Sequence, residues 1–248
     1  MAAAAPGHQQ VPGGEQAERE GHEMVDNYEL VLHDGSKQPD LAFLVYAVPG
    51  LESGVAGFSF RGGYPIAWFQ QGVNPGAIVH VQWTASYALM CARQPCRVGD
   101  LWQAGATEQD VEPGRAYLLD YTNGDYCFKH ATPSGDLPPT AIDLYTSGNV
   151  PGFDTGRGPS VALGIPIGRQ PAPVPVLAAN SGPNLTHRFR LPPVYRIWAG
   201  QDVQGEMLGA ATVEQHQEVR FDRETSTDPW RAEWTLDSSN QWREGPPS

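Results

Sequence analysis

The sequence has little positive charge. Its 248 residues include 16 Lys and Arg against 28 Asp and Glu, which gives a formal net charge of −12 at pH 7. Nucleic acid is bound by clustered cations that neutralise phosphates, and an anionic membrane surface is bound by a basic face. The composition therefore argues against nucleic acid and membranes as partners. A surface charge that keeps the protein soluble is the simplest interpretation.

Cysteine is also scarce, with only Cys91, Cys96 and Cys127. An odd number this small does not build a disulfide-stapled scaffold. Cys91 and Cys96 are near enough in sequence to pair, but Cys91 ends an apolar strand, so a buried free thiol is the preferred interpretation. The start of the chain lacks a basic and apolar leader, and no run reaches the roughly 18 apolar residues of a membrane span. We therefore expect a cytoplasmic protein.

The sequence contains none of the short motifs that mark common enzyme classes. It has no His-X-His, Cys-X-X-Cys or His-Glu-X-X-His spacing for a metal, no Gly-X-Ser-X-Gly for a nucleophile and no Walker pattern for a nucleotide. Cys127 and His130 are three positions apart, so on a strand they project to opposite faces and cannot converge on one ion. We expect no metal and no cofactor.

The clearest pattern that is present runs from Pro65 to Cys91. Asn74-Pro75-Gly76 predicts a turn, because Pro sets the φ of the second turn residue and Gly accepts the positive φ that follows. After this turn, apolar and polar residues alternate with a period of two, interrupted at Ala85, which is typical of a half-buried strand. The apolar face carries Val79, Val81, Trp83, Tyr87, Leu89 and Cys91, and the polar face carries His80, Gln82, Thr84 and Ser86.

A hairpin is predicted between Ala116 and Ala131. Asn123-Gly124 separates two apolar and aromatic runs, and both residues tolerate the positive φ of a two-residue hairpin loop. This loop sets the register, so Tyr121 faces Tyr126, Leu119 faces Phe128 and Tyr117 faces His130 on one side of the sheet. Asp120 lies on the opposite side, diagonal to Lys129.

The rest of the chain predicts short strands separated by turns, as expected from its 28 Gly and 23 Pro. We count roughly ten to twelve strands at spacings typical of a sandwich. The fold class is therefore an all-β, antiparallel β-sandwich in a single domain over residues 26–245, preceded by a disordered tail at 1–25 that has too few large apolar residues to fold. The expected local features are a strand ended by Pro49-Gly50, an edge strand or bulge at Pro166, two strands separated by Pro192-Pro193, a short helix within 207–216 and a strand over 213–221.

Several short motifs resemble one known family. They are AlaTrpPhe at 67–69, ProGly at 75–76, the Val79 and Trp83 spacing, ProAsn at 183–184, TyrArgIleTrpAlaGly at 195–200, GlnGlyGlu at 204–206 and the Leu236, Asn240 and Trp242 spacing. The chain resembles the RhiA-like family of quorum-sensing-regulated, rhizosphere-expressed proteins over about residues 27–243. The resemblance implies a small all-β protein without an assigned activity or catalytic residues. The segment 90–96, MetCysAlaArgGlnProCys, departs from the family pattern.

The candidate functional residues are aromatic or able to move protons. An imidazole and phenols on one wall of a cavity would serve acid–base chemistry or polar recognition, whereas an ordinary aromatic sheet face and a solvated Asp120–Lys129 ion pair are the structural alternatives. The catalytic candidates are His80, Asp120, His130 and Tyr121. The ligand-binding candidates are Tyr117, Tyr121, Tyr126, His130, Trp68, Trp102 and Trp198.

Three functions remain open from the sequence. The leading hypothesis is a protein that binds an apolar or aromatic small molecule, or that associates with itself, in its simplest form as a homodimer, because the chain has more aromatic residues than one core needs. The second is a cofactor-free cyclase, isomerase or dehydratase of secondary metabolism. The third is a purely structural interaction module.

Overall fold

The computed structural model describes residues 27–55, 58–61, 63–152, 158–168, 172–201, 203–213, 216–221 and 230–247. Within these residues the chain forms 17 strands and one short helix, α1 (Ala210–Val213), which confirms the all-β class. The helix falls in the stretch where the sequence indicated one. The tail expected at residues 1–25 lies outside the described residues.

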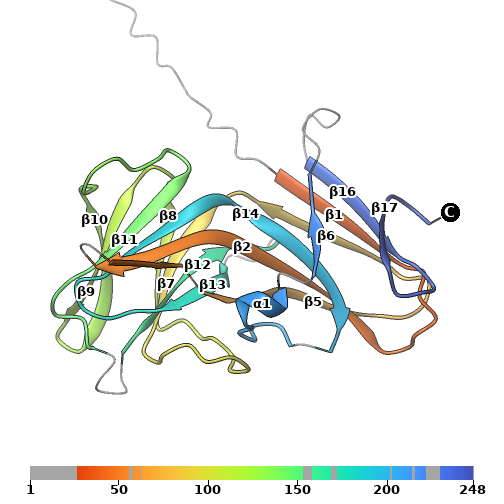
Figure 1. Cartoon of the computed structure of the whole chain (residues 1–248), viewed down its shortest axis with the longest axis horizontal. Helices are drawn as coiled ribbons and strands as arrows, with labels where there is room; N and C mark the ends of the chain where they lie inside the picture. The colour runs from red at the N-terminus through yellow and green to blue at the C-terminus, as the bar shows by residue number, and fades with distance from the viewer. Residues whose placement is uncertain are drawn as a thin grey trace, which may run out of the picture.

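The largest sheet has eight strands and forms one layer of the sandwich. Its order is β10-β9-β11-β14-β2-β3, with β5 also paired to β2 and β15 to β14. The bounds are β10 (Asp125–Ala131), β9 (Ala116–Thr122), β11 (Ala141–Thr146), β14 (Thr186–Gly200), β2 (Leu41–Val55), β3 (Phe58–Arg61), β5 (Ala67–Val73) and β15 (Gln217–Val219). β2 and β14 are each 15 residues long and run along most of the elongated molecule (Figure 1). We call this layer the long sheet.

The second layer consists of two smaller sheets. The five-stranded sheet has the order β4 (Tyr64–Pro65), β13 (Val174–Asn180), β12 (Ser160–Ile165), β7 (Tyr87–Ala92) and β8 (Ala106–Val111). The four-stranded sheet has the order β17 (Trp242–Glu244), β16 (Trp230–Leu236), β1 (Asn27–Asp34) and β6 (Ile78–Thr84). In Figure 1 the five-stranded sheet lies in the left half of the molecule and the four-stranded sheet at its right. The long sheet therefore bridges both.

One continuous cluster of buried apolar side chains fills the space between the layers. Phe43 and Ile142 enter it from the long sheet, Leu163 from the five-stranded sheet and Leu30 from the four-stranded sheet. All four are fully buried. Alternation along each strand produces this arrangement, since successive side chains point to opposite faces.

The stretch from Val79 to Cys91 corrects one expectation. All six predicted apolar residues are buried in the core cluster, but they come from two strands in different sheets. The chain leaves the four-stranded sheet at the end of β6, bends at Ala85 and enters the five-stranded sheet as β7. The alternation continues across the bend because both sheets cover the same face of the long sheet.

Three prolines that were expected to end strands lie within them instead. β2 continues through Pro49 and β14 continues through Pro192 and Pro193. The register of the two strands shifts between Arg190 and Val194, so the Pro pair lies in a bulge opposite Pro49. A bulge leaves residues out of the hydrogen-bond ladder, which removes the penalty for the missing N–H groups.

Other local expectations also need correction. Pro166 does not mark an edge, because β12 ends at Ile165 and lies between β13 and β7. The alternative expectation of a bulge agrees with the register shift of β12 against β13 between Leu163 and Gly164. The strand expected over 213–221 is only the three residues of β15. Two neighbouring pairs, β1–β16 and β9–β11, run parallel. The sandwich is therefore mostly, not wholly, antiparallel, because distant chain segments enter these sheets in the same direction.

The β9–β10 hairpin confirms its predicted register. Tyr121 pairs with Tyr126 and Tyr117 with His130. Asn123 has φ 56° and Gly124 has φ 90°, as the two-residue loop requires.

Candidate functional site

An open pocket lies at one end of the long sheet, where β2, β5 and β14 are side by side. It has a volume of about 350 Å³, near the lower limit for pockets that hold small molecules. It is lined by Asp40, Leu41, Ala42, Gln70, Gly72, Val73, Asn74, Gly200 and Gln201. We call it the Asp40 pocket.

The floor of the Asp40 pocket is flat because its three central residues have almost no side chains. Ala42 on β2 pairs with Gly72 on β5 and with Gly200 on β14, so the three lie in one row across the sheet. A Cβ added to Gly72 would meet no atom within 4 Å. A ligand can therefore approach the backbone of β5 at Gly72, next to Ala42 on β2.

The rim of the Asp40 pocket is polar. It carries the carboxylate of Asp40 and the side-chain amides of Gln70, Asn74 and Gln201. Asp40, at φ 61°, lies in the left-handed region, which costs energy for most residues other than Gly and is best tolerated by Asn and Asp. The Oε1 atom of Gln70 accepts the N–H of Gln204 at 3.2 Å, which holds this side chain at the rim.

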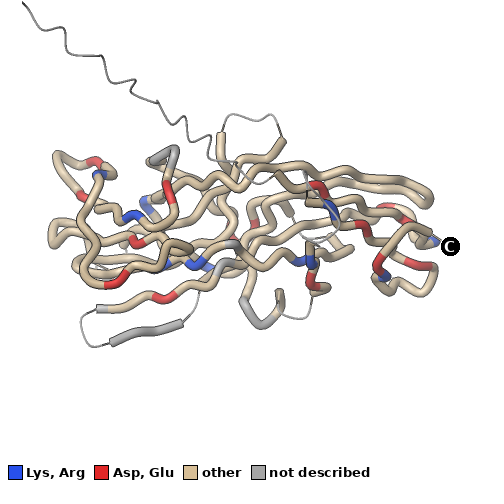
Figure 2. Tube along the Cα trace, turned by 90° about the horizontal axis from the view of Figure 1, so that it is seen from above, with Lys and Arg blue, Asp and Glu red and all other residues tan. Residues whose placement is uncertain are grey.

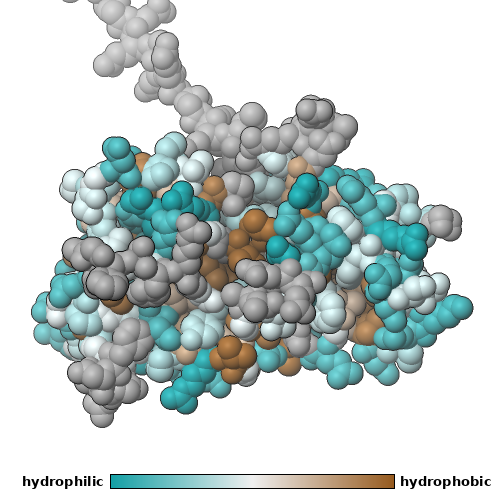
Figure 3. All heavy atoms as spheres, in the orientation of Figure 1, coloured by the Kyte–Doolittle hydropathy of each residue, from teal (hydrophilic) through white to brown (hydrophobic). Residues whose placement is uncertain are grey.

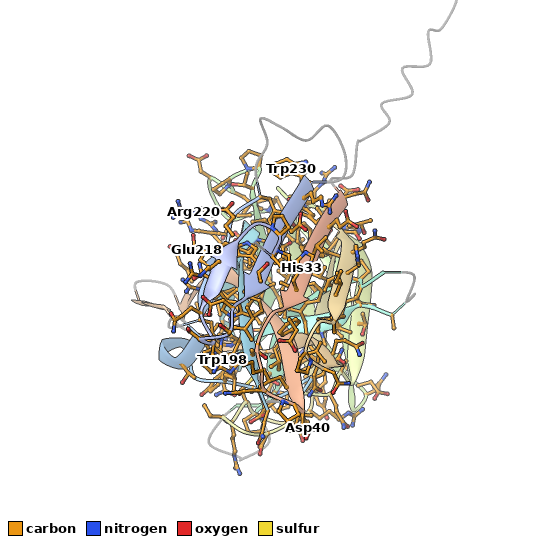
Figure 4. The ribbon with its side chains drawn as sticks, turned by 90° about the vertical axis from the view of Figure 1, so that its right-hand side faces the viewer. His33, Asp40, Trp198, Glu218, Arg220 and Trp230 are labelled. Atoms are coloured by element: carbon orange, nitrogen blue, oxygen red, sulfur yellow. The ribbon has the colours of Figure 1, made fainter. Side chains whose placement is uncertain are left out.

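Trp198 lies directly beside the pocket. Its side chain covers Gly200 so closely that a Cβ on that glycine would be 2.3 Å from the indole Nε1 atom. The indole stacks on His216 at a centroid distance of 4.7 Å and an interplanar angle of 10°, and His216 packs on Tyr46 at 5.0 Å. His216 and Tyr46 are buried, yet Trp198 remains 40% exposed. In the end-on view of Figure 4, Trp198 and Asp40 lie below His33 and Trp230.

The hairpin candidates form two pairs of rings. Tyr117 and His130 lie 5.3 Å apart, and Tyr121 and Tyr126 lie 4.8 Å apart. Tyr117 is buried, and its hydroxyl accepts the N–H of Glu112 at 2.9 Å. Burial raises the pKa of Tyr126 to about 12, so its phenol stays protonated at neutral pH. None of these residues lines the Asp40 pocket.

Asp120 is held in place by its own strand and its neighbours. Its carboxylate accepts hydrogen bonds from Lys129 at 2.7 Å, from Ser147 at 2.7 Å and from the N–H of Tyr121 at 2.9 Å. The hydrogen bond from Lys129 above all lowers the pKa of Asp120, which therefore stays ionised. The expected ion pair with Lys129 is confirmed.

The four catalytic candidates do not meet in one place. His80 lies on the four-stranded sheet, exposed, with its Nδ1 atom 3.3 Å from Glu29. Asp120, Tyr121 and His130 belong to the long sheet, where Asp120 points away from the face that Tyr121 and His130 share. The charged residues instead form pairs along the body, and Figure 2 shows Lys and Arg positions beside Asp and Glu positions.

Most of the aromatic side chains pack against one another. Trp68 lies 5.2 Å from Trp83, and Trp83 lies 5.3 Å from Tyr28 and 4.9 Å from Tyr195. The Nε1–H of Trp83 donates to the hydroxyl of Tyr195 at 2.9 Å. Trp102 is buried on the outer side of the five-stranded sheet, where its Nε1–H donates to Ser160 at 2.8 Å. Among the tryptophans expected to bind a ligand, Trp198 alone is exposed.

A buried Ser–His–Ser chain was not expected from the sequence. The hydroxyl of Ser53 lies 2.8 Å from Nδ1 of His187, and the hydroxyl of Ser181 lies 2.8 Å from its Nε2. All three side chains are inaccessible to solvent, and burial lowers the pKa of His187 to about 4. Because no substrate reaches these atoms, the chain is a structural link between β2, β14 and the segment after β13.

The pocket residues Asp40, Gln70, Asn74 and Gln201 were also missed. They come from three separate segments and carry no motif of a binding site, since only strand pairing brings these segments together. One weak signal was present, because the family motif at 195–200 places a glycine two positions after Trp198 on the same face of a strand.

The described residues contain neither a cluster of metal ligands nor a helix that could span a membrane. No three or more His, Cys, Asp and Glu side chains there are grouped to hold a metal ion. No described helix has the length and apolar character needed to cross a membrane.

Comparison with known proteins assigns the chain to a family. Neither the curated proteins nor the solved structures contain a match. The family model RhiA matches residues 25–243, which is nearly the whole chain. The protein therefore belongs to the RhiA family.

Proposed function

We propose that this protein binds a small molecule in the Asp40 pocket. The observation that supports the proposal is the open floor at Ala42 and Gly72, beside the exposed indole of Trp198 that covers Gly200. Strand faces in a folded protein normally carry side chains that fill such space. Here the space is open, and polar groups at its rim are available to orient a ligand.

Binding is preferred over catalysis at this site. Among the described residues that line the pocket, Asp40 is the one with an ionisable side chain. Acid–base chemistry needs a second group within hydrogen-bond reach to return or accept the proton. The cofactor-free enzyme of secondary metabolism is therefore the weaker candidate.

A variant that fills the pocket tests the proposal. Gly72→Phe places a ring where a Cβ meets open space, whereas Gln71→Phe adds the same ring to the opposite face of β5 as the matched control. We would screen a fragment library by NMR of the ¹⁵N-labelled protein. Hits should shift the amides of Ala42, Gly72 and Gly200, persist in Gln71→Phe and disappear in Gly72→Phe. No hit at these amides would overturn the proposal.

Self-association is a second candidate, favoured by three exposed aliphatic side chains. Val98, Leu101 and Val203 are 61%, 49% and 49% exposed. They lie on two loops joined by hydrogen bonds such as Gly99 N–H to the carbonyl of Met207 at 2.8 Å. The face shown in Figure 3 is mostly polar, with a small hydrophobic area near its middle.

Light scattering tests this candidate. A dimer that becomes a monomer in Leu101→Ser/Val203→Ser would support it, since exposed apolar side chains are buried when copies associate. A monomer in the unmodified protein at high concentration would contradict it.

The cytoplasmic location expected from the sequence belongs to the same proposal. It is supported by the three unpaired thiols, because reducing compartments keep cysteines free. Recovery of the protein from a secreted or periplasmic fraction would contradict it.

A further inference from the structure

We infer that the ligand of the Asp40 pocket is a neutral saccharide. This inference rests on the proposed function and adds the chemical class of the ligand. It follows from the charge of the pocket, from the hydrogen-bonding groups of its rim and from the shape of its floor.

The charge of the pocket disfavours an anionic ligand. The lining residues that the structure describes include no Lys, Arg or His, and they include Asp40. The chain as a whole carries a formal charge of −12. A phosphate or a carboxylate would lie near the carboxylate of Asp40 without a counter-charge, and like charges repel each other.

The rim matches the hydrogen bonding of hydroxyl groups. Asp40 accepts hydrogen bonds, while the amides of Asn74 and Gln201 each have a donor and an acceptor. A sugar hydroxyl both donates and accepts, so neighbouring hydroxyls on one ring find partners in this mixed set. A cation would pair with Asp40 but could not accept hydrogen bonds from the amide N–H groups of Asn74 and Gln201.

The floor matches a ring with an apolar face. The open surface at Ala42 and Gly72 lets a flat ring approach the sheet, and the Nε1 edge of Trp198, which lies over Gly200, borders this surface. The stacked ring of His216 supports Trp198 from one side. A pyranose presents C–H groups on its faces and hydroxyls at its edge. Its face can therefore pack on the floor and the indole, while its hydroxyls bond to the polar rim.

The pocket suits a saccharide better than an apolar aromatic ligand. Leu41 and Val73 are the larger apolar side chains in the lining, and the pocket is open to solvent. An apolar aromatic molecule would leave most of its surface in water and would bury the polar rim without partners. A saccharide keeps its outer hydroxyls hydrated in the same position.

The test uses NMR titration of the intact protein with named probes. The neutral probes are maltotriose, cellotriose and triacetylchitotriose, the acidic probe is glucuronic acid, and the aromatic probes are indole and phenol. We expect at least one neutral sugar to shift the amides of Gly72 and Gly200 saturably. Its affinity should fall at least tenfold in Gly72→Phe and in Trp198→Ala, and less than twofold in Gln71→Phe.

The outcomes separate this inference from the proposed function. If indole or phenol shifts these amides and no neutral sugar does, the inference of a saccharide ligand is wrong, but the proposed binding site is supported. If glucuronic acid binds more tightly than every neutral sugar, the inference that the ligand is uncharged is wrong. If no probe and no library fragment shifts these amides, both proposals fail together.

Discussion

His187 is a buried residue whose protonation state the fold decides. Its two ring nitrogens face the hydroxyls of Ser53 and Ser181, and a neutral imidazole satisfies both because each hydroxyl both donates and accepts. The charged imidazolium would have to be buried without a carboxylate among these partners. Burial therefore lowers the pKa of His187 from 6.5 to about 4.

We predict that stability falls as His187 is forced to take up a proton. A lowered folded-state pKa means that the unfolded chain binds more protons between pH 6.5 and 4. The free energy of unfolding therefore has its full value above pH 6.5. It decreases by up to about 3 kcal/mol as the pH falls toward 4. The measurement is the free energy of unfolding in urea at pH 7 and pH 4.5.

Two variants isolate the contribution of His187. His187→Gln should show a smaller loss of stability between the two pH values than the unmodified protein does. His80→Gln, at an exposed histidine, should keep the full loss. Equal losses in the unmodified protein and in His187→Gln would refute the prediction.

The cysteines should differ in reactivity. Burial raises the pKa of Cys91 and of Cys96 to about 12, so neither forms the reactive thiolate at pH 8. Cys127 is only partly buried, on β10. A thiol reagent followed by mass spectrometry should therefore modify Cys127 first under native conditions, and all three cysteines in denaturant. Rapid native labelling of Cys91 would contradict this burial.

At the scale of elements, the β9–β10 hairpin depends on its turn. Gly124 has φ 90°, a conformation that residues with a Cβ rarely adopt. Gly124→Ala should reduce the free energy of unfolding by about 1–2 kcal/mol. Gly72→Ala is the matched control, because its added Cβ meets open space and the strand has an ordinary φ. Its effect should stay within about 0.5 kcal/mol. Denaturant unfolding compares the two, and equal effects would count against the strained turn.

The end of β14 holds Trp198 in place through the absence of a side chain at Gly200. A Cβ there would lie 2.3 Å from the indole Nε1 atom, so Gly200→Ala must displace the ring from His216. We expect a large shift of the Trp198 indole N–H resonance, assigned from its loss in Trp198→Phe. Gly72→Ala should move this resonance much less. An unchanged resonance in Gly200→Ala would show that Trp198 does not cover Gly200.

At the scale of the whole molecule, β2 and β14 connect the two halves. The core cluster includes side chains from all three sheets, and these two strands supply it along their length. We therefore expect one cooperative unfolding transition. Fluorescence of the Trp68 and Trp83 cluster reports on the half that contains the four-stranded sheet, and pulse labelling of Cys91 reports on the other half. Their midpoints in urea should coincide, and two separate transitions would show that the halves unfold independently.

Neighbouring residues were enough to predict much of the local structure of this protein. Period-two alternation identified the buried faces, as the burial of the six apolar residues between Val79 and Cys91 shows, and Asn123-Gly124 set the register of its hairpin. These features depend on neighbours within a few residues, which a single strand or turn contains. The same local reasoning was wrong at Pro49 and Pro192, because a proline ends a strand only if its missing N–H would face a ladder partner.

Which distant residues lie together became visible only in the folded molecule. Asp40, Gly72 and Gly200 share one pocket because β2 pairs with β5 on one side and with β14 on the other, across more than a hundred positions of chain. Trp68 and Trp198 were both candidates for ligand binding from the sequence. In the structure Trp68 lies in the core, whereas Trp198 is exposed beside the pocket. The difference is the face of the sheet that each indole occupies, and that depends on long-range strand pairing, which local periodicity does not encode.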